Sequence, residues 1–91
     1  MTTLLCRNRV RDLAKWKAVF DSHAAAHRAA GLRLRAVWRG LEEDDQVFLL
    51  FDVTDAEKAR AFITAPEGAE AGRASGVLEG EYHFLESASH Y

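Results

Sequence analysis

Two hydrophobic periodicities alternate along this 91-residue chain, and their order is the feature that most restricts its fold. Apolar and polar residues alternate, as in half-buried strands, in three segments: 3–10, 32–39 and 78–86. Two other segments, 13–30 and 54–65, place apolar residues every three to four positions, which is typical of amphipathic helices. The segment 46–53, QVFLLFDV, is apolar on both alternating faces. The predicted order of elements is therefore β-α-β-β-α-β.

Residues with strong boundary preferences mark the ends of both helical segments. Asp12 is a typical N-cap and Gly31 a typical left-handed stop, so the first helix is predicted to run between them without interruption. Thr54 opens a capping box, Thr-Asp-Ala-Glu, for the second helix, which Pro66 ends. Residues 67–75 are expected to form a further short helical turn.

The chain contains no linker, repeat or low-complexity stretch, so residues 1–91 are expected to form a single domain. Right-handed crossovers applied to the predicted order give a ferredoxin-like βαββαβ fold of the α+β class. In this fold the four-stranded antiparallel sheet has the strand order 4-1-3-2. Both helices cover one face of the sheet, and the other face has no helix.

The helix-free face of the predicted sheet carries apolar side chains that a monomer would leave exposed. They are Leu5, Val37, Phe48, Leu50 and Leu85. On the same face, two arginines are expected to pair across strands with acidic residues: Arg7 and Arg9 with Glu79, Glu81 or Asp52. An apolar centre with a polar rim suits a partner sheet better than water. We therefore predict a homodimer that packs sheet against sheet.

Composition excludes several classes of protein. A net charge of −2 and an isoelectric point near 6.0 argue against a nucleic-acid partner or a membrane-surface role. The sequence has no window of about 18 apolar residues, and its first ten residues do not resemble a signal peptide. A cytoplasmic protein is therefore expected. The single cysteine, Cys6, lies in an alternating apolar segment and is interpreted as an unreactive core residue.

Two histidines share one face of the first predicted helix with two large aromatic side chains. At about 100° per residue, His23 and His27 fall at the centre of the stripe that contains Trp16 and Phe20. A histidine on an apolar helix face is often a hydrogen-bonded core residue. Burying two titratable rings costs free energy unless each finds a partner, so the pair is also a candidate functional site.

Three motifs carry a resemblance to a known superfamily: W-K-x-x-F-D-x-H at 16–23, D-x-x-K-A-x-x-F at 55–62 and Y-H-F-L-E at 82–86. Together with the order of elements, they resemble the dimeric α+β barrel superfamily. More particularly, they resemble its small cyclase-like and antibiotic-biosynthesis-monooxygenase-like proteins. The resemblance extends over nearly the whole chain. It implies a dimeric barrel and, in each subunit, a pocket between the sheet and the helices.

The predicted faces of the elements place further side chains in that region. Asn8 and Tyr82 would bring polar groups from two strands toward the two histidines. Five aromatic residues would form the walls and contact a small aromatic molecule: Trp16, Phe20, Trp38, Phe51 and Phe62. These aromatic side chains are also the kind that fill a core, and both interpretations remain open at this point.

The first functional hypothesis is an enzyme that acts on an aromatic or polyketide-like substrate without a cofactor. A neutral histidine near pH 7, His23 or His27, can remove a proton from a phenol or an acidic C–H group. Asn8 or Tyr82 would then hold the resulting oxyanion. In a monooxygenase the carbanion-like substrate reacts with dioxygen, and in a cyclase it attacks a carbonyl group.

Two alternative functions remain open. One is a non-catalytic module that binds a small molecule or a partner, or that serves assembly. The other is a haem or metal pocket, because His23 and His27 are spaced i and i+4. The sequence has no HExxH motif and no third ligand at a convincing spacing, so neither a metal nor another cofactor is predicted.

Overall fold

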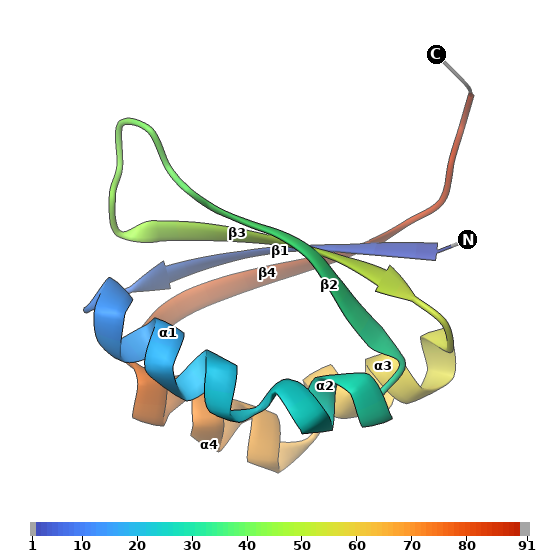
Figure 1. Cartoon of the computed structure of the whole chain (residues 1–91), viewed down its shortest axis with the longest axis horizontal. Helices are drawn as coiled ribbons and strands as arrows, with labels where there is room; N and C mark the ends of the chain where they lie inside the picture. The colour runs from blue at the N-terminus through green and yellow to red at the C-terminus, as the bar shows by residue number, and fades with distance from the viewer. Residues whose placement is uncertain (1, 90–91) are drawn as a thin grey trace.

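The computed structural model of the protein describes residues 2–89 (Figure 1). Its elements are β1 (Thr2–Val10), α1 (Leu13–Ser22), α2 (Ala24–Ala29), β2 (Leu32–Arg39), β3 (Gln46–Val53), α3 (Ala56–Thr64), α4 (Pro66–Ser75) and β4 (Val77–Leu85). All four strands lie within one residue of their predicted bounds. The helical segments differ more from the prediction.

The strands form one antiparallel sheet in the order β2-β3-β1-β4. All four helices lie on the same side of this sheet, as Figure 1 shows. The predicted strand order and the ferredoxin-like α+β fold with one helix-free face are thereby confirmed. The central strands are β1 and β3, while β2 and β4 form the edges.

The hydrophobic core lies between the sheet and the helices, and β3 contributes most to it. Four alternate residues of β3 are each no more than 4% exposed: Val47, Leu49, Phe51 and Val53. The residues between them, including Phe48 and Leu50, face the helix-free side and are only partly buried. One apolar face of β3 therefore belongs to the core, and the other belongs to the helix-free face of the sheet.

Aspartate side chains cap both helical segments at their N-termini. Asp12 Oδ1 accepts a hydrogen bond from the backbone N–H of Lys15 over 3.1 Å, which confirms the predicted N-cap. In the second segment, Asp55 Oδ1 accepts from the backbone N–H of Lys58 over 3.1 Å. Thr54, the predicted N-cap, instead donates its backbone N–H to the carbonyl oxygen of Gly31 over 2.9 Å.

The predicted helix 13–30 is interrupted at His23, where φ is −101° and ψ is 11°. In a continuous helix the carbonyl oxygen of Val19 would accept the backbone N–H of His23. Here Val19 O accepts the Ser22 hydroxyl over 2.6 Å and lies 2.8 Å from His23 Nδ1. The backbone N–H of His23 bonds instead to Phe20 O over 3.0 Å. Two local side chains thus displace one backbone hydrogen bond and divide the helix.

The segment after Pro66 is more regular than predicted. The expected short turn is the ten-residue helix α4, with Pro66 in its first turn and Gly76 as a left-handed C-cap at φ +85°. Pro66 suits this place because the first helical N–H groups need no partner within the helix. No helix within residues 2–89 is long and apolar enough to cross a membrane.

A β-bulge in β2 corrects the predicted faces of two residues. The register of β2 with β3 shifts between Leu34 and Ala36. Beyond the shift, Val37 pairs with Leu49 and Trp38 pairs with Phe48. Directly paired residues share a face, so Trp38 lies on the helix-free face and Val37 on the other. The prediction that Trp38 faces the helices is therefore wrong, because one extra residue reverses the alternation.

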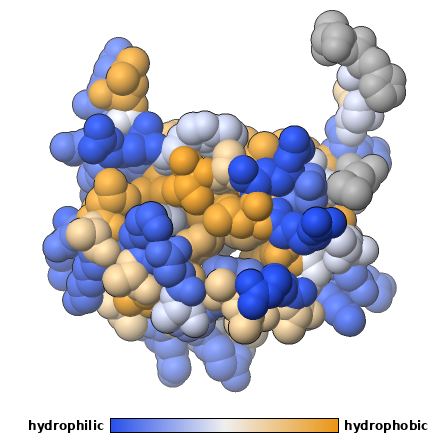
Figure 2. All heavy atoms as spheres, viewed as in Figure 1, coloured by the Kyte–Doolittle hydropathy of each residue, from blue (hydrophilic) through white to orange (hydrophobic). Residues whose placement is uncertain are grey.

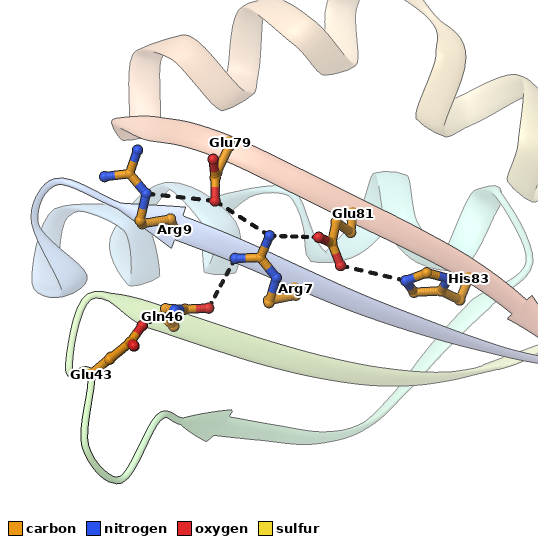
Figure 3. A network of polar contacts seen from close by, with 7 residues as sticks. All are labelled: Arg7, Arg9, Glu43, Gln46, Glu79, Glu81 and His83. Atoms are coloured by element: carbon orange, nitrogen blue, oxygen red, sulfur yellow. Dashed lines mark hydrogen bonds and ion pairs between the residues drawn. The ribbon is translucent and has the colours of Figure 1, made fainter.

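A polar network crosses the helix-free face around Arg7 (Figure 3). Its guanidinium donates to Glu81 over 2.7 Å, to Glu79 over 3.3 Å and to Gln46 Oε1 over 2.9 Å. Arg9 Nε lies 3.6 Å from Glu79. These contacts confirm the predicted cross-strand pairs. Asp52, the third predicted acidic partner, pairs instead with Arg35 on β2, over 3.5 Å.

Two glycines allow a matched test of backbone strain, because both have positive φ: +77° at Gly31 and +85° at Gly76. At Gly31 an added Cβ would lie 3.0 Å from Thr54 Oγ1, whereas at Gly76 the nearest atom is 3.5 Å away. We expect Gly76→Ala to lower the free energy of unfolding by about 1 kcal/mol, and Gly31→Ala to lower it further. Urea denaturation at equal protein concentration measures both, and equal losses would contradict the steric part of the argument.

Candidate functional site

A cavity of about 130 Å³ lies between the sheet and the helices. Figure 2 shows apolar side chains around an opening between these two layers. All eight elements contribute lining residues: Leu4, Cys6, Trp16, Val19, Phe20, His23, His27, Leu32, Leu49, Phe51, Phe62, Ile63, Gly68, Ala71, Gly72, Ser75, Val77 and Tyr82. We call this space the inner cavity.

His27 stands among three phenylalanine rings at the wall of the inner cavity. Its ring centroid lies 4.8 Å from that of Phe20, 5.5 Å from that of Phe62 and 5.8 Å from that of Phe51. Burial among these rings lowers the pKa of His27, and the neighbouring His23 lowers it further. A neutral imidazole is therefore favoured at this position near pH 7.

The hydrogen bonding of His23 determines which of its nitrogens is free. Nδ1 lies 2.8 Å from Val19 O, and a carbonyl oxygen can only accept a hydrogen bond. Nδ1 must therefore carry the proton in this contact, which leaves Nε2 of the neutral ring as an acceptor. The contact with Val19 O at the helix break thus sets the tautomer of a histidine at the wall of the inner cavity.

Trp16 and Phe20 form an apolar wall on α1. Their rings stack with centroids 4.9 Å apart and planes inclined by 19°. Trp16 is 3% exposed, so its position is fixed by the core around it. The wall that this pair forms is rigid and suited to contact with a flat aromatic molecule.

Tyr82 and Cys6 lie opposite the histidines on paired strands, as register partners in β4 and β1. Tyr82 is 49% exposed, and burial of the rest of its side chain raises the pKa of its phenol, to which Cys6 adds. Tyr82 is thus a neutral hydrogen-bond donor near pH 7. Burial raises the pKa of Cys6 to about 12, so its thiol is not a nucleophile.

Seven of the predicted site residues line the inner cavity: Trp16, Phe20, His23, His27, Phe51, Phe62 and Tyr82. Asn8 and Trp38 do not line it. Asn8 lies on the same strand as Cys6, beside Gly80, and its buried Oδ1 has no hydrogen-bond partner within residues 2–89. Trp38 is 50% exposed on the helix-free face. These two residues lie outside the cavity that the sequence predicted them to share.

The sequence analysis missed the contribution of α4. Four small residues of this helix line the inner cavity: Gly68, Ala71, Gly72 and Ser75. Their spacing of three and four positions places them on one helix face, so the cavity exists where larger side chains would otherwise fill the core. That spacing was the available signal. The glycines of this segment lower its helix propensity, so that only a short helical turn is expected from the sequence.

A second hollow, of about 360 Å³, adjoins the inner cavity beside α2 and β2. Its lining residues are Phe20, Asp21, Ala24, His27, Arg28, Leu32, Arg33 and Leu34. Three of them, Phe20, His27 and Leu32, also line the inner cavity. We call this space the outer hollow.

Within residues 2–89, no group of three or more His, Cys, Asp or Glu side chains is arranged to hold a metal ion. The cavity-lining groups with polar atoms are mainly the two imidazoles, the phenol of Tyr82 and the hydroxyl of Ser75. This arrangement offers imidazole acceptors and a phenolic donor beside apolar walls, which is suited to removing a proton and holding the resulting anion.

No protein-family model matches the sequence, and no curated protein matches it. Solved structures do resemble the fold. A candidate antibiotic biosynthesis monooxygenase from Bordetella bronchiseptica has a TM-score of 0.76 and 15% sequence identity, with 97% of each chain covered. The cofactor-independent oxygenase SnoaB from Streptomyces nogalater has a TM-score of 0.69 and 18% identity, covering 98% of this chain and 94% of the other.

A third similar structure is an uncharacterized NIPSNAP domain protein from Burkholderia xenovorans. It has a TM-score of 0.68 and 14% identity, covering 98% of this chain and 96% of the other. These likenesses extend over almost the whole chain and agree with the superfamily that the sequence motifs resemble. At such low identity they establish the fold, and the chemistry has to be argued from the site itself.

The environment of His27 predicts a specific titration. Its imidazole C–H signals are expected to titrate with a midpoint below the ordinary value of 6.5, because the charged form loses hydration among the phenylalanine rings. NMR spectroscopy as a function of pH measures this midpoint. The His27 imidazole binds a proton more tightly in the unfolded chain than in the folded one, so protonation of His27 favours unfolding. The contribution of neutral His27 to the free energy of unfolding is therefore complete above about pH 6.5 and is lost as the pH falls toward the folded-state pKa.

The variant His27→Leu keeps an apolar side chain of similar size and is expected to lack this part of the pH dependence. A midpoint above 6.5 in the wild-type protein would contradict the proposed neutral state.

Proposed function

We propose that this protein is a small-molecule enzyme of the cofactor-free monooxygenase type, acting on an aromatic substrate whose ring enters the inner cavity. The observation that carries the proposal is the contact between His23 Nδ1 and Val19 O, which leaves Nε2 free as a base at the cavity wall. The likeness in fold to SnoaB and to candidate monooxygenases supports the same class of reaction.

The volume of the inner cavity restricts the substrate. Its 130 Å³ is close to the roughly 150 Å³ of an engineered apolar cavity that binds benzene. One six-membered ring would fill it, and any further part of the substrate would lie in the outer hollow. This volume favours oxygenation of a single ring over cyclisation of a long polyketide chain, which would have to fold inside the site.

The proposed reaction begins with removal of a phenolic proton by Nε2 of His23. The electron-rich ring carbon of the phenolate then adds dioxygen, which is the oxidant, and forms a hydroperoxide. Loss of water leaves a carbonyl group at that carbon, so that a phenol and O₂ give a quinone and H₂O. Tyr82, as a neutral phenol on the opposite wall, is placed to donate a hydrogen bond to the developing oxyanion.

A homodimer through the helix-free face is part of the proposal. The bulge in β2 adds Trp38 to the apolar residues of this face, beside Phe48. The charges of Arg7, Glu79 and Glu81 are already paired within one subunit (Figure 3). Pairing within the subunit lowers the cost of covering these charges with a second sheet.

Replacement of the proposed base tests the reaction. We expect His23→Gln to lower the rate of oxygen uptake with phenols or hydroquinones by about 10²-fold or more, because general-base catalysis contributes at least this factor. An oxygen electrode measures the rate, and circular dichroism checks that the variant is folded. His83→Gln, on the opposite face of the sheet, is the matched control and should retain the rate.

Two results would contradict the proposal. Equal oxygen uptake by wild type and His23→Gln would exclude His23 as the base. Ring binding in the cavity without turnover of any phenol or hydroquinone tried would instead favour the non-catalytic binding module.

The dimer is tested by placing a charge at its proposed centre. Phe48→Asp should give monomer or aggregate on a sizing column, because the carboxylate would have to be buried against the partner sheet. Leu41→Asp is the matched control, since Leu41 lies in the loop before β3 and is 99% exposed. A Phe48→Asp protein that elutes as a dimer would contradict the proposed interface.

A further inference from the structure

Gly72 occupies a position where the backbone does not require a glycine. It lies in the interior of α4, and glycine is the least favourable residue for a helix interior after proline. Within residues 2–89, positive φ angles occur at Gly31 and Gly76 only, so the conformation of Gly72 is open to any L-amino acid. The consequence of a glycine at this position is therefore to be found in the space around it.

The space around Gly72 differs from that around Gly68, the other glycine of α4. Apart from the backbone of its own helix, a Cβ added to Gly72 would meet only Val77 Cβ, at the ordinary van der Waals distance of 3.9 Å. A Cβ added to Gly68 would lie 3.2 Å from the carbonyl oxygen of Phe62, which is a tight contact. An alanine therefore fits at position 72 without any movement of its surroundings, whereas at position 68 it does not.

The free space beside Gly72 belongs to the inner cavity, because Gly72 and its neighbour Val77 both line that cavity. Ser75, which also lines it, does not extend into this space. The hydroxyl of Ser75 donates a hydrogen bond to the carbonyl oxygen of Gly72 over 2.9 Å and is thereby held against the helix. Protein interiors are close-packed, so a methyl group added at position 72 would take up volume that is now part of the cavity.

We propose that Gly72 leaves the space that a six-membered aromatic ring needs in the inner cavity, and that this residue determines the size of the substrate ring. This inference rests on the proposed function and assigns a specificity-determining residue to it. The cavity of about 130 Å³ has room for one such ring and little more. A methyl group at position 72 would compete with the ring for this volume, whereas a smaller apolar ligand would still fit.

The variant Gly72→Ala is expected to change stability and ligand binding in opposite directions. Alanine has the higher helix propensity and its methyl group fills part of an apolar cavity, so the melting temperature should rise by about 5 °C. The same methyl group should weaken the binding of phenol by about tenfold, which is the effect of one methylene group in a hydrophobic pocket. A residue with a purely structural role would not produce this opposition.

Two probes of different size, phenol and xenon, measure the space in the cavity, because an apolar cavity can take either a ring or a xenon atom. Binding is followed by NMR through the indole N–H signal of Trp16, which lines the inner cavity and is distinguished from that of Trp38 by the variant Trp38→Phe. The variants are Gly72→Ala and Gly72→Val. Ala74→Val is the matched control, because Ala74 is exposed on the same helix and does not line the cavity.

Gly72→Ala should bind phenol about tenfold more weakly than the wild-type protein does and should keep its affinity for xenon. Gly72→Val should show no binding at phenol concentrations that saturate the wild-type protein, because its side chain takes up still more of the cavity. Ala74→Val should bind both probes as the wild-type protein does. Thermal denaturation followed by circular dichroism measures the stability of each variant.

The possible failures are distinguishable. Equal affinity for phenol in the wild-type protein and a more stable Gly72→Ala would overturn the role of Gly72 and leave the ring site and the proposed reaction standing. A loss of both stability and binding in Gly72→Ala would also overturn it, since the methyl group would then disturb the fold. If phenol does not shift the Trp16 signal of the wild-type protein, the inner cavity does not take a ring, and both this inference and the proposed function are overturned.

Discussion

The pairing of β1 with β3 at the centre of the sheet is the interaction on which the rest of the structure depends. It aligns the buried residues of both strands, such as Leu4 opposite Phe51, into one apolar surface that the helices cover. The same pairing places Arg7 opposite Phe48 on the helix-free side. One central pair of strands therefore defines two surfaces. The side that faces the helices forms one wall of the inner cavity, and the helix-free face carries apolar side chains and paired charges.

The inner cavity exists because the layer of helices does not fill the space beside the sheet. The small residues of α4, including Gly72, leave room, while the stacked Trp16 and Phe20 form a fixed wall. The two histidines of the cavity wall are controlled by different interactions. Burial among phenylalanines keeps His27 neutral, whereas the contact of Nδ1 with Val19 O orients His23 and leaves its Nε2 free.

Much of the fold could be predicted from local patterns. Alternation predicted the strands, Asp12 predicted a helix start, and the chirality of crossovers then allowed one strand order. The predicted grouping of His23, His27 and Phe20 survives the helix break, since all three side chains line the inner cavity. The predicted face of Trp38 is wrong because a single bulge reverses the alternation of β2. The residues around Arg35 carry no pattern that predicts this bulge.

The sequence by itself determined the order of elements, the apolar faces of the strands and the amphipathic stripe of the first helix, since these depend on periodicity within short segments. Only the tertiary structure decided which side chains meet. The volume of the inner cavity depends on how α4 packs against α1 and β4, and the pairing of Arg7 with Glu81 depends on a cross-strand register over 74 positions. Such contacts between distant segments leave no periodic pattern in the sequence.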